Sequence, residues 1–169
     1  MESVHTKIRI DRVWSMPNKF TFTIPPIAKL LKEEMVGLIA DPFAGKNSPA
    51  HEQNDINEET AGSIDADHTD ALTWLKGKRT ARYDTVLYDP PYSITQARMY
   101  GKKEFSSMKY WADCKNEIAR ILKPGGKAIC FGWSSMGIGK NRGFEMSRLL
   151  VVCHGGSRND TLVTVETKK

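Results

Sequence analysis

The stretch Asp84-Thr-Val-Leu-Tyr-Asp89-Pro-Pro-Tyr92 is a short run of β-forming residues that ends in a polar turn. The apolar and β-branched residues favour a buried strand over Tyr83–Tyr88. A proline directly after Asp89 forces that residue into extended geometry, and neither Pro90 nor Pro91 carries an N–H group. The turn therefore presents a rigid carboxylate and an outward carbonyl with no competing donor.

This pair of acceptors suits an amino group with two hydrogens. Tyr92 adds a ring on which a planar base can stack. A Pro-Pro turn around a buried tyrosine is the purely structural alternative. The four residue types at a strand end form a poor packing arrangement and a good amine site, so the pattern favours Asp89, Pro90, Pro91 and Tyr92 as a catalytic segment.

A second strand end has similar features in Gly37-Leu-Ile-Ala-Asp41-Pro-Phe-Ala-Gly45. A predicted buried strand, Val36 to Ala40, is followed by a carboxylate and then a tight turn with glycine. Ligands of open α/β sheets bind at the carboxyl ends of the strands, so this loop can face a cofactor. A strand cap with a turn glycine is the structural alternative.

The rest of the chain alternates short apolar runs with helix-like stretches, which indicates an α/β protein with a mostly parallel sheet. Further strands are expected at Lys127 to Gly132, Leu149 to Cys153 and Thr161 to Glu166, and helices at Pro25 to Met35 and Lys109 to Leu122. The turn-rich residues 154–160 predict that the last two strands form an antiparallel hairpin.

Composition points to one globular domain over residues 1–169, with 40% hydrophobic and 27% charged residues. The 3 cysteines are widely spaced and form no CxxC pair, which favours reduced thiols and no metal site. No apolar stretch approaches the ~18 residues of a membrane span. We therefore expect a cytoplasmic protein. Its net charge of +5 is compatible with a polyanionic partner but does not require one.

The chain resembles the S-adenosylmethionine-dependent amino-methyltransferases of nucleic acids, above all the DNA adenine N6 enzymes, whose signature is Asp-Pro-Pro-Tyr. The resemblance spans nearly the whole chain in the right order. It implies a Rossmann-like class I methyltransferase domain, with a seven-stranded, mostly parallel sheet that ends in an antiparallel hairpin. One departure is Asn47, which stands where the family usually has a second glycine.

The resemblance also implies how S-adenosyl-L-methionine is bound. The family's cofactor loop corresponds to Asp41, Pro42, Phe43, Ala44 and Gly45, with Asp41 near the methionine amino group. Asp55 would bind the ribose hydroxyls and Ile56 would pack on the adenine ring.

Two further segments complete this cofactor site. Asp70 and Ala71 match the element whose acid binds the adenine amine, with residues 65–67 as a competing assignment. Residues 18–24 resemble the segment that closes over the methionine end, which adds Phe22 and Thr23. Asp89 would border both the cofactor and the substrate.

The implied reaction is methylation of adenine N6 in DNA. The adenine would be flipped out of the duplex and oriented by Asp89, Pro90 and Tyr92. Cytosine N4, an RNA guanine, a protein glutamine and a catalytically silent subunit remain alternatives. The chain has no room for a separate recognition domain, so specificity would come from loops such as Ser93 to Ser107, from a second subunit or from a copy of itself. This compactness is typical of phage-type and other stand-alone prokaryotic enzymes.

Basic residues near the same sheet edge are candidates for DNA phosphate contacts. They follow three predicted strand ends: Lys102 and Lys103, Lys140 and Arg142, and Arg158. Ordinary surface charge is the alternative for each. Tyr100 and Phe105 flank the first pair and are candidates to hold the flipped base. By contrast, the basic residues of 76–82 precede a strand and are expected at the opposite edge.

Overall fold

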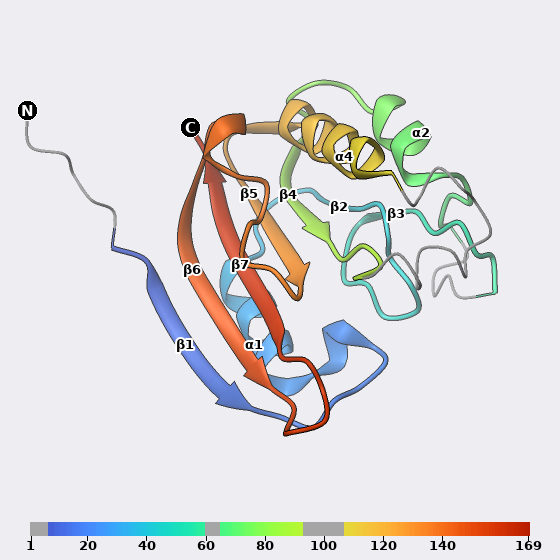
Figure 1. Ribbon diagram of the computed structural model, residues 1–169. Helices are drawn as coiled ribbons and strands as arrows, with labels where there is room; N and C mark the ends of the chain where they lie inside the picture. Colours follow the sequence, from blue (N-terminus) through green and yellow to red (C-terminus); the bar gives the residue numbers. More distant parts are fainter. Residues whose placement is uncertain (1–6, 60–64, 93–106) are drawn as a thin grey trace, which may run out of the picture.

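A seven-stranded sheet forms the centre of the protein in the computed structural model, which describes residues 7–59, 65–92 and 107–169 (Figure 1). The strands are β1 (Arg9–Trp14), β2 (Ile39–Asp41), β3 (Glu52–Gln53), β4 (Tyr83–Tyr88), β5 (Leu122–Gly132), β6 (Phe144–Cys153) and β7 (Thr161–Lys168). The helices are α1 (Pro25–Glu34), α2 (Ala71–Lys76) and α4 (Met108–Ile121), with short 3-10 turns η1 (Thr21–Thr23) and η3 (Lys140–Arg142). No helix of the described residues is long and apolar enough to cross a membrane.

The strand order is β1-β6-β7-β5-β4-β2-β3. β7 runs antiparallel to both of its neighbours, β5 and β6, while every other neighbouring pair is parallel. The predicted mostly parallel sheet with a closing antiparallel hairpin is confirmed. The central strands of a mostly parallel sheet carry apolar side chains on both faces, so each face needs a layer that covers it.

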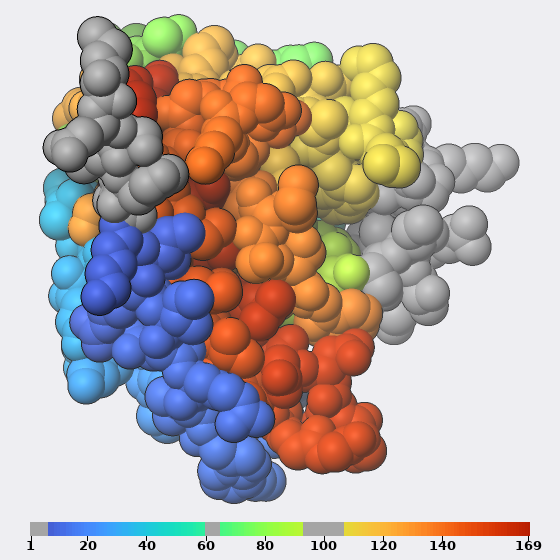
Figure 2. Space-filling model, turned by 60° about the vertical axis from the view of Figure 1, so that its left-hand side comes forward, coloured from blue at the N-terminus to red at the C-terminus, as the bar shows by residue number. Residues whose placement is uncertain are grey.

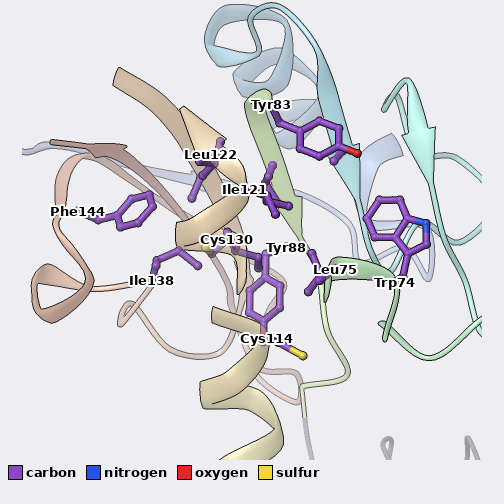
Figure 3. Close-up of a cluster of buried hydrophobic side chains, with 14 of the residues drawn as sticks. Trp74, Leu75, Tyr83, Tyr88, Cys114, Ile121, Leu122, Cys130, Ile138 and Phe144 are labelled. Atoms are coloured by element: carbon purple, nitrogen blue, oxygen red, sulfur yellow. The ribbon is translucent and has the colours of Figure 1, made fainter. Parts of the chain in front are cut away.

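Alternating side chains of the central strands enter two separate apolar clusters. Ile39, Leu87 and Ile129 lie on the face covered by α1, which contributes side chains at helical spacing, namely Ile27, Leu30 and Leu31. On the other face, Val86 and Ala128 pack with α2 and α4. Figure 3 shows this second cluster, in which the ring of Tyr88 points toward Cys114 of α4 and Trp74 approaches from α2. The central strands are thereby held between two helical layers.

The N-terminal strand β1 was not expected from the sequence. Every residue of β1 except Asp11 is exposed, and charged residues interrupt its apolar ones, so it lacks the run that predicts a buried strand. Its place depends on a parallel ladder with β6, in which Ile10 is aligned with Leu149. The strand is thus defined by a contact with a segment more than a hundred residues away.

A buried arginine joins β1 to the helical layer behind the sheet. Arg148 of β6 is 6% exposed and donates to three carboxylates. Its Nη1 lies 2.7 Å from Glu33 Oε2 and 3.2 Å from Glu34 Oε1, and its Nε lies 3.1 Å from Asp11 Oδ2. These hydrogen bonds compensate the burial of the guanidinium and tie three elements together.

Three other strands begin at residues different from those expected, and one of them is β6, which begins at Phe144 rather than Leu149. β2 begins at Ile39 rather than Val36, because Val36 and Leu38 donate their backbone N–H groups to the side chains of Thr85 and Asp84. β5 begins at Leu122 rather than Lys127, so it includes Pro124, Gly125 and Gly126. A register shift between Tyr83 and Thr85 of β4 accommodates those extra residues.

The loop that connects β5 to β6 is held by a buried glutamate, Glu166. The Glu166 carboxylate is 2% exposed and accepts hydrogen bonds from the backbone N–H groups of Ile138 (2.5 Å) and Gly139 (3.1 Å). Burial raises the pKa of Glu166, and these two hydrogen bonds oppose the rise. Gly137, with φ of 55°, brings the loop backbone against this carboxylate.

We predict that Gly137→Ala lowers the free energy of unfolding by more than the ~1–2 kcal/mol that a left-handed conformation costs a residue with a Cβ. The added methyl would overlap the Glu166 carboxylate and break its two hydrogen bonds. Gly143→Ala is the matched control, because its φ is 83° but no atom lies within 4 Å of a Cβ there. Urea unfolding of the two variants measures the difference. Equal losses would show that Glu166 does not restrain the loop.

Candidate active site

A cavity of about 810 Å³ opens where the carboxyl ends of β2 and β4 meet, within the usual volume range of ligand sites. β2 and β4 are hydrogen-bonded parallel neighbours, so the segments that follow them emerge at the same edge. Four segments and three single residues line the cavity: residues 18–22, 42–47, 54–57 and 89–92, with Ala71, Tyr110 and Trp111. The two strand-end turns singled out in the sequence therefore share one cavity.

The loop after β2 is held from beneath by a buried carboxylate. Asp41 is 0% exposed and accepts hydrogen bonds from the Ser48 hydroxyl (2.6 Å) and the Phe43 backbone N–H (2.9 Å). Pro42, Phe43, Ala44 and Gly45 line the cavity, but Asp41 itself does not. Asp41 thus shapes the loop and does not present its carboxylate to a ligand.

A second carboxylate holds the other end of this loop and faces the cavity. Asp55 Oδ2 accepts from the backbone N–H of Gly45 (2.9 Å), and Asp55 Oδ1 accepts from that of Asn57 (2.9 Å). Ile56 lies beside it in the lining. Asp55 is thereby fixed at the cavity wall, with an apolar side chain next to it.

The third predicted cofactor acid, Asp70, lies outside the cavity lining. Asp70 is the N-cap of α2, where it accepts from the Thr73 N–H (2.9 Å) and from the Tyr110 hydroxyl (2.6 Å). Ala71 lines the cavity and Asp70 does not. Asp67, the competing assignment, forms an isolated bridge to Asn54 and accepts from the Trp74 indole (2.6 Å), so it also lies outside the lining.

Asp89 lies at the end of β4, partly buried inside the cavity. The Tyr92 hydroxyl donates to Asp89 Oδ1 at 2.6 Å, and the Thr21 hydroxyl forms a second hydrogen bond. Burial raises the pKa of Asp89 to about 6, and both hydrogen bonds work against that rise. The carboxylate is therefore oriented from two sides and is ionised near neutral pH.

The segment 18–22 crosses the cavity beside Asp89. Phe22 lines the cavity and packs edge-on against Phe131, with ring centroids 5.3 Å apart. Thr23 is exposed and outside the lining, because its hydroxyl donates to the Phe20 carbonyl (2.8 Å) and accepts from the Asn18 amide (3.0 Å). Of the two residues predicted here, the structure brings Phe22 to the cavity and leaves Thr23 outside.

Sequence reasoning missed several lining residues, notably Trp111 and Thr21. Trp111 is in the first turn of α4 and lies 6.0 Å from the Phe43 ring, centroid to centroid. An apolar residue near the start of a helix is a weak signal, and the helical pattern alone does not indicate that this turn borders the loop after β2. Lys19 and Lys46 are further lining residues that were missed.

The predicted phosphate contacts lie away from the cavity or outside the described residues. Lys140 and Arg142 form η3, and Arg142 Nε donates to Asn116 Oδ1 (2.7 Å). Arg158 is exposed in the hairpin between β6 and β7. Lys102 and Lys103, like Tyr100 and Phe105, belong to the part of the chain that the structure does not describe.

Comparison with known proteins identifies the fold. No family model and no curated protein matches this chain. Among solved structures it is similar to TrmN from Thermus thermophilus, with a TM-score of 0.60 and 19% identity over 86% of this chain. The chain spans 49% of TrmN, about half of its length.

Two other solved structures agree. The methyltransferase YhhF from Escherichia coli has a TM-score of 0.54 and 12% identity, covering 86% of this chain and 83% of that one. A Burkholderia thailandensis 1,6-didemethyltoxoflavin-N1-methyltransferase, solved with S-adenosylhomocysteine, has a TM-score of 0.59 and 13% identity, covering 86% and 77%. The chain therefore has the Rossmann-like class I methyltransferase fold.

The burial of Asp41 generates a pH prediction. Burial is the main cause that raises its pKa to about 7 from 3.8, so between about pH 4 and 7 the folded protein holds a proton that the unfolded chain releases. The free energy of unfolding should therefore fall as pH rises through this window, by up to about 4 kcal/mol.

Asp41→Asn should remove the part of the slope that comes from Asp41, because an amide cannot ionise, whereas the raised pKa values of Asp89 and Glu166 should leave a smaller slope of the same sign. Asp113→Asn, a change at an α4 carboxylate that pairs with Lys109 (2.6 Å), is the control and should leave the slope unchanged. Thermal and urea unfolding at several pH values measure both. An unaltered slope in Asp41→Asn would contradict the assignment.

Proposed function

We propose that the protein transfers a methyl group from S-adenosyl-L-methionine to the exocyclic N6 of adenine in DNA. The observation that carries the proposal is the position of Asp89, Pro90, Pro91 and Tyr92 in the same cavity as the loop after β2 and Asp55. One part of the cavity thus offers acceptors for an amino group, and the other offers a binding site for a cofactor.

The residues of the second part fit the cofactor. Backbone of Pro42–Gly45 is available to the methionine moiety, and the Asp55 carboxylate can accept from ribose hydroxyls. Ile56 and Trp111 supply apolar surface for an adenine ring. The S-adenosylhomocysteine in the Burkholderia structure supports this choice of cofactor. When bound, S-adenosylmethionine supplies an electrophilic methyl group.

The chain's own contribution is orientation of the amine. The N6 lone pair of adenine is delocalised into the ring, which makes N6 a poor nucleophile. Hydrogen bonds from the two N6 hydrogens to the Asp89 carboxylate and the Pro90 carbonyl favour a more tetrahedral nitrogen. Asp89, whose pKa is about 6, can then hold the proton that N6 loses and release it to solvent.

Tyr92 has two functions in this proposal. Its hydroxyl fixes Asp89, and its ring is part of the cavity lining, packed edge-on to Trp133 with centroids 5.8 Å apart. Stacking of a flipped base on such a ring contributes about 1–3 kcal/mol, which offsets part of the cost of removing the base from the duplex.

We expect N6-methyladenine when the purified protein, S-adenosylmethionine labelled in its methyl group and unmethylated duplex DNA are combined. Nucleoside digestion with mass identification is the measurement. Asp89→Ala should reduce the rate at least ~10²-fold, because it removes the acceptor that orients the amine. Binding of S-adenosylhomocysteine without any methylated DNA would contradict the DNA substrate, and parallel reactions on RNA and protein would then identify the acceptor.

The pKa of Asp89 sets the expected pH profile. kcat/KM for the DNA reports ionisations of the free protein, so it should rise with pH to about 6, where the carboxylate becomes charged, and level off above it. Asp89→Asn retains an acceptor that does not titrate. Its lower activity should lack this rise, and a rise that persists would exclude Asp89 as the titrating group.

Cofactor binding tests the other half of the site. Asp55→Asn should weaken binding of S-adenosylhomocysteine about 10–100-fold, since hydrogen bonds to a charged group contribute about 1.5–3 kcal/mol. Asp113→Asn is again the matched surface control. Isothermal calorimetry gives both affinities. An unchanged affinity in Asp55→Asn would show that this carboxylate does not contact the ligand.

A further inference from the structure

The edge strand β1 combines an open backbone with exposed apolar side chains. Within residues 7–59, 65–92 and 107–169 it is the terminal strand of the sheet and pairs on one side, with β6. Ile10 is 67% exposed and Trp14 is 63% exposed, and Ile8, just before the strand, is 42% exposed. Figure 2 shows β1, in blue, at the surface. Charged residues often protect such an edge, and β1 carries Arg9, Asp11 and Arg12, so pairing requires a partner strand whose charges are complementary.

The charges of β1 are complementary to those of the same strand in a second copy. Two copies related by a two-fold axis would pair in an antiparallel manner. In an antiparallel pair, residues directly opposite each other point to the same face of the sheet, whereas successive residues of one strand point to opposite faces. A residue can therefore face its own copy or a residue an even number of positions away, so the two-fold axis lies between two copies of the same residue. With the axis at Ile10, Arg9 lies opposite Asp11 of the second copy, and Asp11 lies opposite its Arg9.

The apolar residues agree with this register. Ile10 then faces Ile10 of the second copy, and Ile8 lies diagonally to the same residue, which forms a cluster of four isoleucines on one face. Ile8 directly faces Arg12, whose aliphatic stem can cover it. On the other face, the Asp11 carboxylate already forms ion pairs with Arg148 and Arg9 of its own chain. In the dimer, Arg9 of the second copy would be the third cation beside it.

Neighbouring registers are less favourable. An axis at Asp11 would oppose two carboxylates, and an axis at Arg12 would oppose two guanidinium groups. An axis at Val13 would place Ser15 opposite Asp11 and Pro17 opposite Arg9, so the pairing of opposite charges would be lost. β1 ends at Trp14, and Ser15 is 8% exposed with its N–H bonded to the Cys153 carbonyl (3.0 Å).

We propose that β1 pairs with β1 of a second copy, in antiparallel register about Ile10, to form a homodimer with one continuous sheet. The ladder is short, so the dimer is weak and its population depends on concentration. Four steps along the strand order separate β1 from β4, so the interface leaves the cavity accessible. The proposal stands independently of the proposed methyl transfer.

Charge placed at the axis tests the register. Ile10→Lys and Ile10→Glu each put like charges opposite each other, and each should sediment as a monomer where the unaltered protein is a dimer. A mixture of the two variants should recover the dimer, because lysine then faces glutamate. Val36→Lys, at a 49% exposed apolar residue outside β1, is the control and should remain dimeric. Sedimentation velocity over a concentration series measures these four samples and the unaltered protein.

A monomeric unaltered protein throughout the series would overturn the proposal, as would dimers of Ile10→Lys. Failure of the mixture to recover the dimer would overturn the register. Mild oxidation of Ile10→Cys is a second measurement. Its thiol should form a disulfide across the axis, whereas Trp14→Cys should not, since residue 14 does not face itself in this register. The three native cysteines are buried and do not compete.

Discussion

The parallel pairing of β2 with β4 is the constraint on which the candidate site depends. Ile39 is aligned with Thr85 and Ala40 with Val86, so the chain leaves both strands at one edge and at the same height. In this register Asp41, the last residue of β2, is level with Leu87, and Asp89 follows two residues further along, just after β4. Any sequence that forms this ladder with polar turns after both strands brings those turns together, although more than forty residues separate them.

Two carboxylates close together in a protein interior destabilise each other's charged form. The surroundings of Asp41 and Asp89 differ. Asp41 is fully enclosed, and hydrogen bonds from Ser48 and Phe43 use its oxygens within the loop. Asp89 is held by Tyr92 and Thr21 and still faces the cavity. Burial raises the pKa of both, to about 7 for Asp41 and to about 6 for Asp89. Of the two, only Asp89 lies in the cavity lining, where its carboxylate can act as an acceptor.

The far side of the sheet is built on different contacts. The antiparallel strand β7 joins β5 to β6, and Glu166 within it holds the short loop that connects those two strands. Arg148 in β6 then gathers carboxylates from β1 and α1. On this side of the sheet, hydrogen bonds to buried charged groups hold the loop and the strands in place, whereas the central strands are held by apolar packing against helices. β1 is left as an exposed edge, which is the feature that favours pairing with a second copy.

The sequence by itself determined those features that depend on neighbouring residues. The prolines after Asp89 define its turn, the apolar runs define β4 and β7, and the turn residues 154–160 define the hairpin. The tertiary structure decided the features that depend on distant partners: β1 exists through β6, and Thr21 reaches Asp89. It also brought the Tyr110 hydroxyl to Asp70 and placed Trp111 in the cavity wall. The physical reason is that backbone propensity acts over a few residues, whereas ladder pairing and side-chain burial join residues whose separation along the chain carries no local signal.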